Sequence, residues 1–213
     1  MLREKVAKQE LDKNVYGNLP GSKSLFKMRY DCNDEALAEA VIGPDCNHAP
    51  IDLKAVIGPD CNHAPIDLSL IGKSENYHLY HFTTQGSDAY TQIHIALNEW
   101  NSTVRRMNDD GIYNGGAIAP FANMIYYKSL TLGCAIKYCT SPDYNNWFAI
   151  ACVYGATPKL GEPLYLADST DKKGCIANDL CQKLVLKNSR CSTRTGLCET
   201  YGNKAALTVD CNC

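Results

Sequence analysis

The sequence has no long hydrophobic run. Hydrophobic residues make up 45% and charged residues 21% of the 213 residues, fractions that are near those of globular proteins. Even so, no window approaches the roughly 18 uninterrupted apolar residues that a membrane-spanning helix needs. We therefore expect a soluble protein with no membrane span, long enough for one domain with a normal core and an appendage.

The sequence also lacks an excess of charge of either sign. Lysine and arginine number 21, aspartate and glutamate number 23, and the formal net charge is -2. Binding to nucleic acid or to anionic lipid depends on a long-range positive potential. We therefore expect neither nucleic acid nor an anionic membrane surface as a partner.

An apolar leader is missing from the start of the chain. Met1 is followed directly by the charged run LREKVA, where a secretory signal peptide would have its apolar region. The spacing of Leu2, Val6 and Leu11 predicts one face of a helix that has no capping residue before it. We interpret the chain as N-terminally truncated, with the signal peptide missing.

Cysteine, by contrast, is abundant and even in number. An even set at this density is typical of a secreted protein with disulfide bonds. Zinc is the alternative explanation, but the close spacings are Cys-x4-Cys, Cys-x5-Cys, Cys-x6-Cys and Cys-x-Cys rather than the paired Cys-x2-Cys of zinc sites. We expect disulfides, with the connectivity left open, among the 12 cysteines, namely Cys32, Cys46, Cys61, Cys134, Cys139, Cys152, Cys175, Cys181, Cys191, Cys198, Cys211 and Cys213.

Apolar periodicity predicts further helices over residues 88–107 and 119–128. A short helix is also predicted over residues 33–42, which start with Asn33 and Asp34 as capping candidates and end at Gly43-Pro44. Runs rich in β-forming residues at 132–138 and 147–154 predict an antiparallel hairpin with a long polar loop. Beyond about Pro158 the periodicity fades while six of the twelve cysteines lie in the last 39 residues, which predicts an appendage held by disulfides.

Residues 40–53 are repeated without change at residues 55–68. Two copies are too few for a solenoid, which needs three or more. The perfect identity indicates a recent duplication or a sequence-assembly artefact rather than two separate structural units. It duplicates Cys46 as Cys61 and His48 as His63.

Four stretches, in the right order, resemble the CAP superfamily of cysteine-rich secretory, antigen 5 and pathogenesis-related proteins. Residues 19–32 and the alanine-rich stretch after them are similar to its second helix, and Ser74-Glu75-Asn76-Tyr77 is similar to its G-E-N-I signature. Residues 121–126, followed by Gly133-Cys134-Ala135, resemble the H-F-T-Q-M-V-W element and the G-C-G strand. Residues 150–155 resemble the second family signature. The chain is identified as a member of the nematode activation-associated secreted type.

The resemblance implies an α+β fold, in which an α/β/α sandwich with a central antiparallel sheet is stapled by disulfides. It implies a CAP domain over residues 1–158, with the duplicated segment at 40–68 inside it. Residues 159–213 then form a cysteine-rich hinge and C-terminal extension.

CAP domains often bind a divalent metal on a tetrad of two His and two Glu, residue types that zinc accepts as ligands. Glu75 matches one Glu of this tetrad. Thr103, three residues after Trp100, stands where the second Glu is expected, and Pro120 stands in place of a His. Because one carboxylate cannot hold a transition metal, we expect no metal, no cofactor and no chemistry that depends on them. We interpret Glu75 as a structural hydrogen-bonding residue.

Other candidate residues are weaker. His78 and His81 have His-x2-His spacing, a slight metal hint without a third ligand, and His94 falls on the polar side of its predicted helix. A Gly-x-Ser-x-Gly nucleophile elbow is missing, and paired cysteines are not nucleophiles. Asn101-Ser102-Thr103 is an N-glycosylation acceptor in a secreted chain, but its position on a predicted helix makes an unmodified sequon as good an interpretation.

These observations favour a secreted, non-enzymatic binding protein of a parasitic nematode that acts on a host cell-surface protein. The resemblance extends to integrin-blocking neutrophil and platelet inhibitors, and residues 120–123 are similar to the Asn-Phe-Ala-Asn pattern of the neutrophil inhibitor. Arg-Gly-Asp and Lys-Gly-Asp do not occur in the sequence, so an integrin would be bound by a folded surface.

Two other functions compete with this one. An extracellular sterol or fatty-acid carrier would use the aromatic residues 77–82 and 125–127 to line an apolar cleft, although core packing explains the same residues. A metal-dependent hydrolase is disfavoured by the missing ligands.

Overall fold

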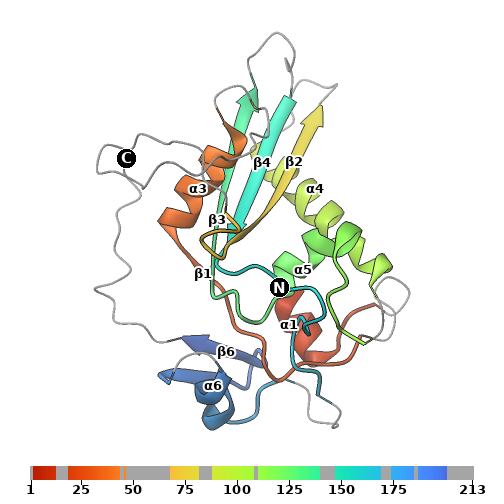
Figure 1. Cartoon of the computed structure of the whole chain (residues 1–213), viewed down its shortest axis with the longest axis vertical. Helices are drawn as coiled ribbons and strands as arrows, with labels where there is room; N and C mark the ends of the chain where they lie inside the picture. Colours follow the sequence, from red (N-terminus) through yellow and green to blue (C-terminus); the bar gives the residue numbers. More distant parts are fainter. Residues whose placement is uncertain are drawn as a thin grey trace. The chain divides into compact units, whose positions relative to one another are not determined.

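The structure is a computed structural model of the chain (Figure 1), described here for residues 2–12, 19–43, 46, 68–81, 88–107, 110–139, 147–168, 174–184 and 187–200. The chain divides into two compact units. Unit 1 takes its described residues from 1–29, 101–130 and 156–208, and unit 2 takes them from 30–100 and 131–155.

Unit 2 is centred on a four-stranded sheet in the order β1-β3-β4-β2. Its strands are β1 (Arg29–Tyr30), β2 (Ser74–His81), β3 (Thr131–Cys139) and β4 (Trp147–Tyr154). β4 pairs antiparallel with both β2 and β3, and it is buried from Ala149 to Tyr154, as expected for a central strand covered on both faces. The predicted hairpin of β3 and β4 is confirmed.

The short edge strand β1 departs from the predicted all-antiparallel arrangement. Backbone hydrogen bonds from Arg29 to Leu130 and from Asp31 to Leu132 advance in the same direction along both segments. β1 is therefore parallel to β3, and the sheet is mixed.

The helix α3 (Cys32–Ile42) covers one face of this sheet. Asp31 is its N-cap and accepts hydrogen bonds from the amides of Asn33 and Asp34 at 2.9 and 3.2 Å, and Gly43 ends the helix with a positive φ of 71°. The sequence predicted the cap at Asn33 or Asp34. Asp34 is instead fully buried, and its carboxylate is paired with the ammonium of Lys73.

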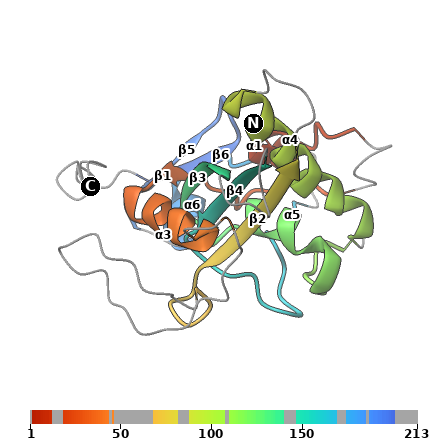
Figure 2. The ribbon, with the colours of Figure 1, turned by 90° about the horizontal axis from the view of Figure 1, so that it is seen from above.

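Alternation along β2 separates the two faces of the sheet. Tyr77 and Leu79 pack with α3 in a core that also contains Leu37, Ala38, Val41, Ile42, Ala149, Ala151 and Val153. His78 points to the other face, where its Nδ1 atom lies 3.2 Å from Oε2 of Glu99 on α4 (Ala89–Ser102). Unit 2 therefore has α3 and α4 on opposite faces of the sheet (Figures 1 and 2), which confirms the α/β/α order.

The helix predicted over residues 88–107 is divided in the structure. α4 ends at Ser102, and a 3-10 turn, η1 (Thr103–Arg106), follows it. Apolar spacing does not distinguish the two helix types over one turn, so this boundary was not predictable from periodicity.

Unit 1 contains α1 (Leu2–Lys8), η2 (Gly116–Ile118) and α5 (Ala119–Ile125). Both predicted helices are confirmed and are shorter than predicted. α5 stops at Ile125 because the ψ angle of Tyr126, 119°, is not helical, and the amide of Ser129 donates to the carbonyl of Tyr126 at 3.0 Å in the turn that follows. Their core consists of Val6, Ala7, Leu19, Leu25, Val104, Phe121, Ala122, Ile125, Tyr126, Leu164, Tyr165 and Leu197.

The cysteine-rich segment of unit 1 forms α6 (Asn178–Leu184) and a hairpin of β5 (Ser189–Ser192) and β6 (Leu197–Thr200). The sequence did not predict these elements, because each is short and carries little apolar periodicity. Leu197 shares the core of α1 and α5. The domain division at residue 158 stays a prediction.

Several predictions fall outside the described residues. They concern residues 44, 45 and 47–67 of the duplicated segment, which include His48, Cys61 and His63, together with Cys211, Cys213 and the hairpin loop 140–146. Among the residues that are described, no helix has both the length and the apolar character needed to cross a membrane.

Candidate functional site

Glu75, the retained carboxylate of the predicted tetrad, lies on β2 in unit 2. It is opposite Val153 of β4, and Val153 is opposite Gly133 of β3. Strand alternation places Glu75 on the face of the sheet that α3 covers, and its Oε2 atom is buried. The structural role that we assign to Glu75 stays a prediction.

Thr103 and Pro120, the two substituted positions, are brought together in unit 1 at the start of α5. Ile118, the N-cap residue of that helix, makes no side-chain capping bond. The hydroxyl oxygen of Thr103 instead accepts a hydrogen bond from the amide of Phe121 at 3.1 Å. Pro120 lies in the first turn, where its missing N–H group has no intrahelical partner to lose. Both residues therefore stabilise a helix N-terminus.

Thr103→Val removes this hydroxyl while keeping the shape of the side chain. We expect the free energy of unfolding to fall by about 1 kcal/mol, the usual cost of losing a capping acceptor. Thr103→Ser is the matched control because it keeps the hydroxyl. Urea unfolding with the disulfides intact measures the difference, and equal midpoints for the two variants would refute the capping role.

The two histidines of the His-x2-His pair are separated by the strand on which they lie. His78 faces α4 and bonds to Glu99, whereas the ring of His81 contacts Trp147 with centroids 4.9 Å apart. Residues three apart on a strand point to opposite faces, so these two imidazoles cannot share one ion. His94 is exposed on α4, as predicted, and the centroid of its ring lies 4.4 Å from that of Tyr90.

Shifted pKa values accompany two polar contacts near the surface, one in each unit. Partial burial of the phenol raises the pKa of Tyr30 to about 12, and nearby Glu35 acts in the same direction. The protonated hydroxyl donates to the carbonyl of Cys134 at 3.1 Å. On unit 1, the hydrogen bond between Lys128 and Glu162, at 3.0 Å, holds the pKa of the carboxylate below its usual value and raises that of the ammonium. Both arrangements tie surface segments together.

Asn101, the predicted glycosylation site, lies in the last turn of α4. Its side chain is half-buried and the amide oxygen is fully buried. Carbohydrate at Asn101 stays a prediction, and this burial favours attachment before the helix has packed.

Disulfides occur within each of the two units. In unit 2, Cys46 bonds to Cys139 and Cys134 bonds to Cys152, and Cys32 is also disulfide-bonded. In unit 1, Cys175 bonds to Cys191 and Cys181 bonds to Cys198. The sequence left this connectivity open.

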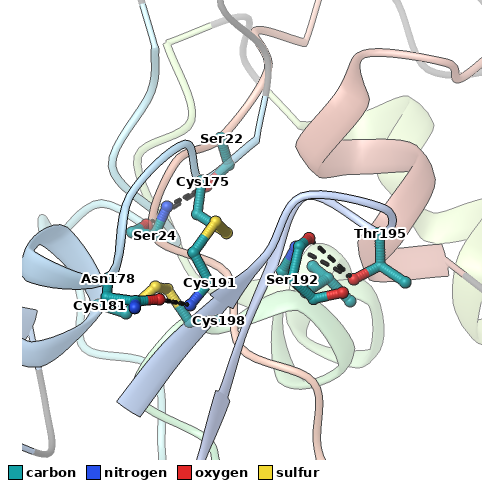
Figure 3. Close-up of a disulfide and its surroundings, with 10 residues drawn as sticks. Ser22, Ser24, Cys175, Asn178, Cys181, Cys191, Ser192, Thr195 and Cys198 are labelled. Atoms are coloured by element: carbon teal, nitrogen blue, oxygen red, sulfur yellow. Dashed lines mark hydrogen bonds between the residues drawn. A yellow bond between two sulfur atoms is a disulfide. The ribbon is translucent and has the colours of Figure 1, made fainter.

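The two disulfides of unit 1 lie beside each other (Figure 3). The Sγ atoms of Cys175, Cys181 and Cys191 all lie within 4.8 Å of one another. Three sulfurs at this separation resemble a metal site, but metals bind thiolates and these sulfurs are in disulfides. The hydrophobic core around them is small and contains Phe26, Leu130 and Leu184. The disulfides therefore contribute much of the stability of this segment.

No family model matches the chain. The Ancylostoma secreted protein of Ancylostoma caninum is 25% identical over an alignment of 213 residues. The alignment covers 93% of this chain and 45% of that protein. The chain therefore spans less than half the length of this curated relative.

Solved structures share the fold. Na-ASP-1 has a TM-score of 0.68 and 23% identity, over 95% of this chain and 43% of that one. The hookworm platelet inhibitor has a TM-score of 0.55 and 17% identity, over 95% of this chain and 90% of that one. The chain is thus similar in sequence to the Ancylostoma secreted protein and shares the fold of Na-ASP-1 and the hookworm platelet inhibitor, in agreement with the resemblance to the CAP superfamily that the four ordered motifs indicate.

Proposed function

We propose that the chain is an extracellular host-interaction protein that binds a host cell-surface protein and has no catalytic activity. The observation that carries this proposal is the fold shared with the hookworm platelet inhibitor over 95% of this chain and 90% of that one. The name of the Ancylostoma secreted protein supports an extracellular location.

A binding role is also supported by what the substituted tetrad positions do. Thr103 caps α5 and Pro120 lies in its first turn, so neither contributes a metal ligand or a proton-transfer group. The imidazoles of His78 and His81 point to opposite faces of β2. Thr103 and Pro120 therefore stabilise a helix of unit 1, and the two histidines of unit 2 cannot bind one ion together.

The finer proposal is that the partner is an integrin on leukocytes or platelets, bound without an Arg-Gly-Asp or Lys-Gly-Asp loop. Tyrosine side chains are frequent energetic centres of protein interfaces. Tyr90 on α4 exposes 73% of its surface, and the ring of His94 packs against it at 4.4 Å. A supported aromatic ring loses little entropy on binding, so Tyr90 is the residue with which to test this surface.

The test is a binding screen of the oxidised protein against immobilised leukocyte and platelet integrin ectodomains, with a tetrad-containing CAP domain as control. The protein is treated with a chelator, which is then removed before mixing. We expect saturable binding that survives this treatment and weakens about tenfold or more in Tyr90→Ala. Asn98→Ala, at an exposed position on the same helix, should bind like the unchanged protein.

No binding by a demonstrably folded sample would reject the integrin proposal. Binding that is unaffected by Tyr90→Ala would support an integrin as the partner but would reject the proposal that Tyr90 of α4 is part of the binding surface.

The alternative function is an extracellular carrier of sterols or fatty acids. The aromatic residues considered for a lipid cleft are largely occupied: Tyr77 packs with α3 and donates a hydrogen bond to the carbonyl of Cys46 at 2.7 Å, and Tyr126 is 2% exposed. This packing ranks the carrier second. Extraction of lipid from the purified protein, followed by mass spectrometry, would reverse the ranking if it yielded a stoichiometric ligand.

A further inference from the structure

In the β5–β6 hairpin, two cysteines lie directly opposite each other but are not bonded to each other. Cys191 and Cys198 are directly opposite partners in the hairpin register. Each is bonded instead to a cysteine outside the hairpin, Cys191 to Cys175 and Cys198 to Cys181 of α6.

Backbone hydrogen bonds show which kind of antiparallel pair Cys191 and Cys198 form. The amide of Cys198 donates to Leu25 and its carbonyl accepts from Lys27, so both groups point away from β5. The amide of Cys191 donates to the side chain of Asn178 at 2.9 Å, away from β6. The pair is therefore non-hydrogen-bonded, a position at which opposite Cα atoms lie about 4.5 Å apart and within the range that a disulfide bridges.

The same chain contains a bonded pair of this kind. Cys134 and Cys152 are directly opposite on β3 and β4, and they form a disulfide with Cα atoms 4.1 Å apart. A bond between Cys191 and Cys198 would repeat this arrangement on the small hairpin.

The sulfurs are also close enough to exchange partners. Sγ of Cys181 lies within 4.8 Å of those of both Cys175 and Cys191, as the adjacent disulfides in Figure 3 show. Cys191 is partly exposed, whereas Cys175 is 2% exposed and Cys181 and Cys198 are 0% exposed. An external thiolate reaches an accessible sulfur first, so Cys191 is the point of entry.

We propose that Cys191 is a site of thiol–disulfide exchange through which the two disulfides of unit 1 change partners. An external thiolate, such as glutathione, attacks Sγ of Cys191, forms a mixed disulfide and releases the thiolate of Cys175. That thiolate attacks Cys181, forms Cys175–Cys181 and releases the thiolate of Cys198. Cys198 then attacks Cys191, forms Cys191–Cys198 and releases the external thiolate. No net oxidation or reduction occurs.

The exchange changes what the hairpin is attached to. In the observed pairing, one disulfide joins β5 to the segment before α6 and the other joins β6 to α6 itself. After exchange, one disulfide lies within the hairpin and the other within the α6 segment. The disulfide links between the hairpin and the α6 segment are lost, while each of the two keeps a disulfide of its own.

The experiment uses the full oxidised chain, incubated with or without a catalytic amount of glutathione at mildly alkaline pH and then quenched with N-ethylmaleimide. Trypsin cuts after Lys183, Lys187, Arg190 and Arg194, and a protease that cuts before aspartate cuts at Asp179, so the four cysteines fall on separate peptides. Mass spectrometry then identifies each cross-link.

We expect a Cys191–Cys198 cross-link only in the sample with glutathione, and about tenfold more glutathione on Cys191 than on Cys198. In a Cys175→Ser, Cys181→Ser variant, the remaining two cysteines should pair on oxidation. In a Cys181→Ser, Cys198→Ser variant, glutathione should open Cys175–Cys191 without a rearranged product.

Two results would overturn the proposal. One is simultaneous reduction of both disulfides with no rearranged cross-link in the unchanged protein. The other is glutathione attached equally to all four cysteines. Both are read from the unchanged chain, so they do not depend on the folding of a variant.

Discussion

Replacing Arg3 with methionine should lower the free energy of unfolding by about 3 to 5 kcal/mol. The Arg3 side chain is 4% exposed. Its guanidinium group donates to four backbone carbonyl oxygens at 2.8 to 2.9 Å, those of Met124, Phe26, Ser129 and Tyr126.

The size of this effect follows from what the guanidinium satisfies. Two of the four acceptors, Met124 and Tyr126, are at the end of α5, where the last carbonyls have no intrahelical donor. Methionine fills similar space but leaves the carbonyls buried without these donors, and each such loss carries a desolvation cost. One charged side chain of α1 thus connects three segments of unit 1.

Urea unfolding of the oxidised protein measures this change. Arg3→Lys should lose less than Arg3→Met, because an ammonium group still donates but cannot match the planar fork of the guanidinium. Lys5→Met, at an exposed position of the same helix, is the matched control and should stay within about 0.5 kcal/mol of the unchanged protein. A similar loss in Arg3→Met and Lys5→Met would contradict the role of Arg3.

Gly133→Ala should destabilise unit 2 by about 3 to 5 kcal/mol or prevent its folding. A Cβ atom at this position would lie 2.0 Å from the amide nitrogen of Glu35, 2.4 Å from the carbonyl carbon of Asp34 and 2.7 Å from the carbonyl oxygen of Asp31. All three are backbone atoms at the start of α3, so no side chain can rotate away to make room. The absence of a side chain on β3 is what lets α3 approach the sheet.

Gly72→Ala is the matched control in the same unit. Gly72 has a positive φ of 72°, and an added Cβ would meet nothing within 4 Å, so only the backbone cost of about 1 to 2 kcal/mol applies. Circular dichroism and thermal unfolding compare the two variants. A Gly133→Ala protein as stable as Gly72→Ala would show that the helix and the sheet can separate without loss.

Local sequence determined several parts of this protein. The helices over residues 2–8, 89–102 and 119–125 were predictable because their apolar residues repeat with the helical period. The helix over 32–42 was predictable from the residues that start and stop it, and the strands over 131–139 and 147–154 from runs of β-forming residues. The resemblance to the CAP superfamily could be found from sequence because four motifs occur in order. The abundance of cysteine likewise predicted disulfides, since so many cysteines are typical of proteins secreted into an oxidising environment.

Other parts were decided by the tertiary structure. Residues 74–81 form a full strand although polar and aromatic residues dominate them, because the ladder with β4 pairs all eight residues. The α6 segment and its hairpin are held by disulfides whose pairing depends on which sulfurs meet in space.

The site residues show the same division. Spacing suggested that His78 and His81 act together, and alternation along a strand sends them to opposite faces. Position in a motif marked Thr103 as a lost ligand, and only the approach of η1 to α5 reveals the amide of Phe121 that it caps. Periodicity is a property of neighbours along the chain and is therefore readable from sequence, whereas these contacts join residues distant in sequence and exist only once the chain has folded.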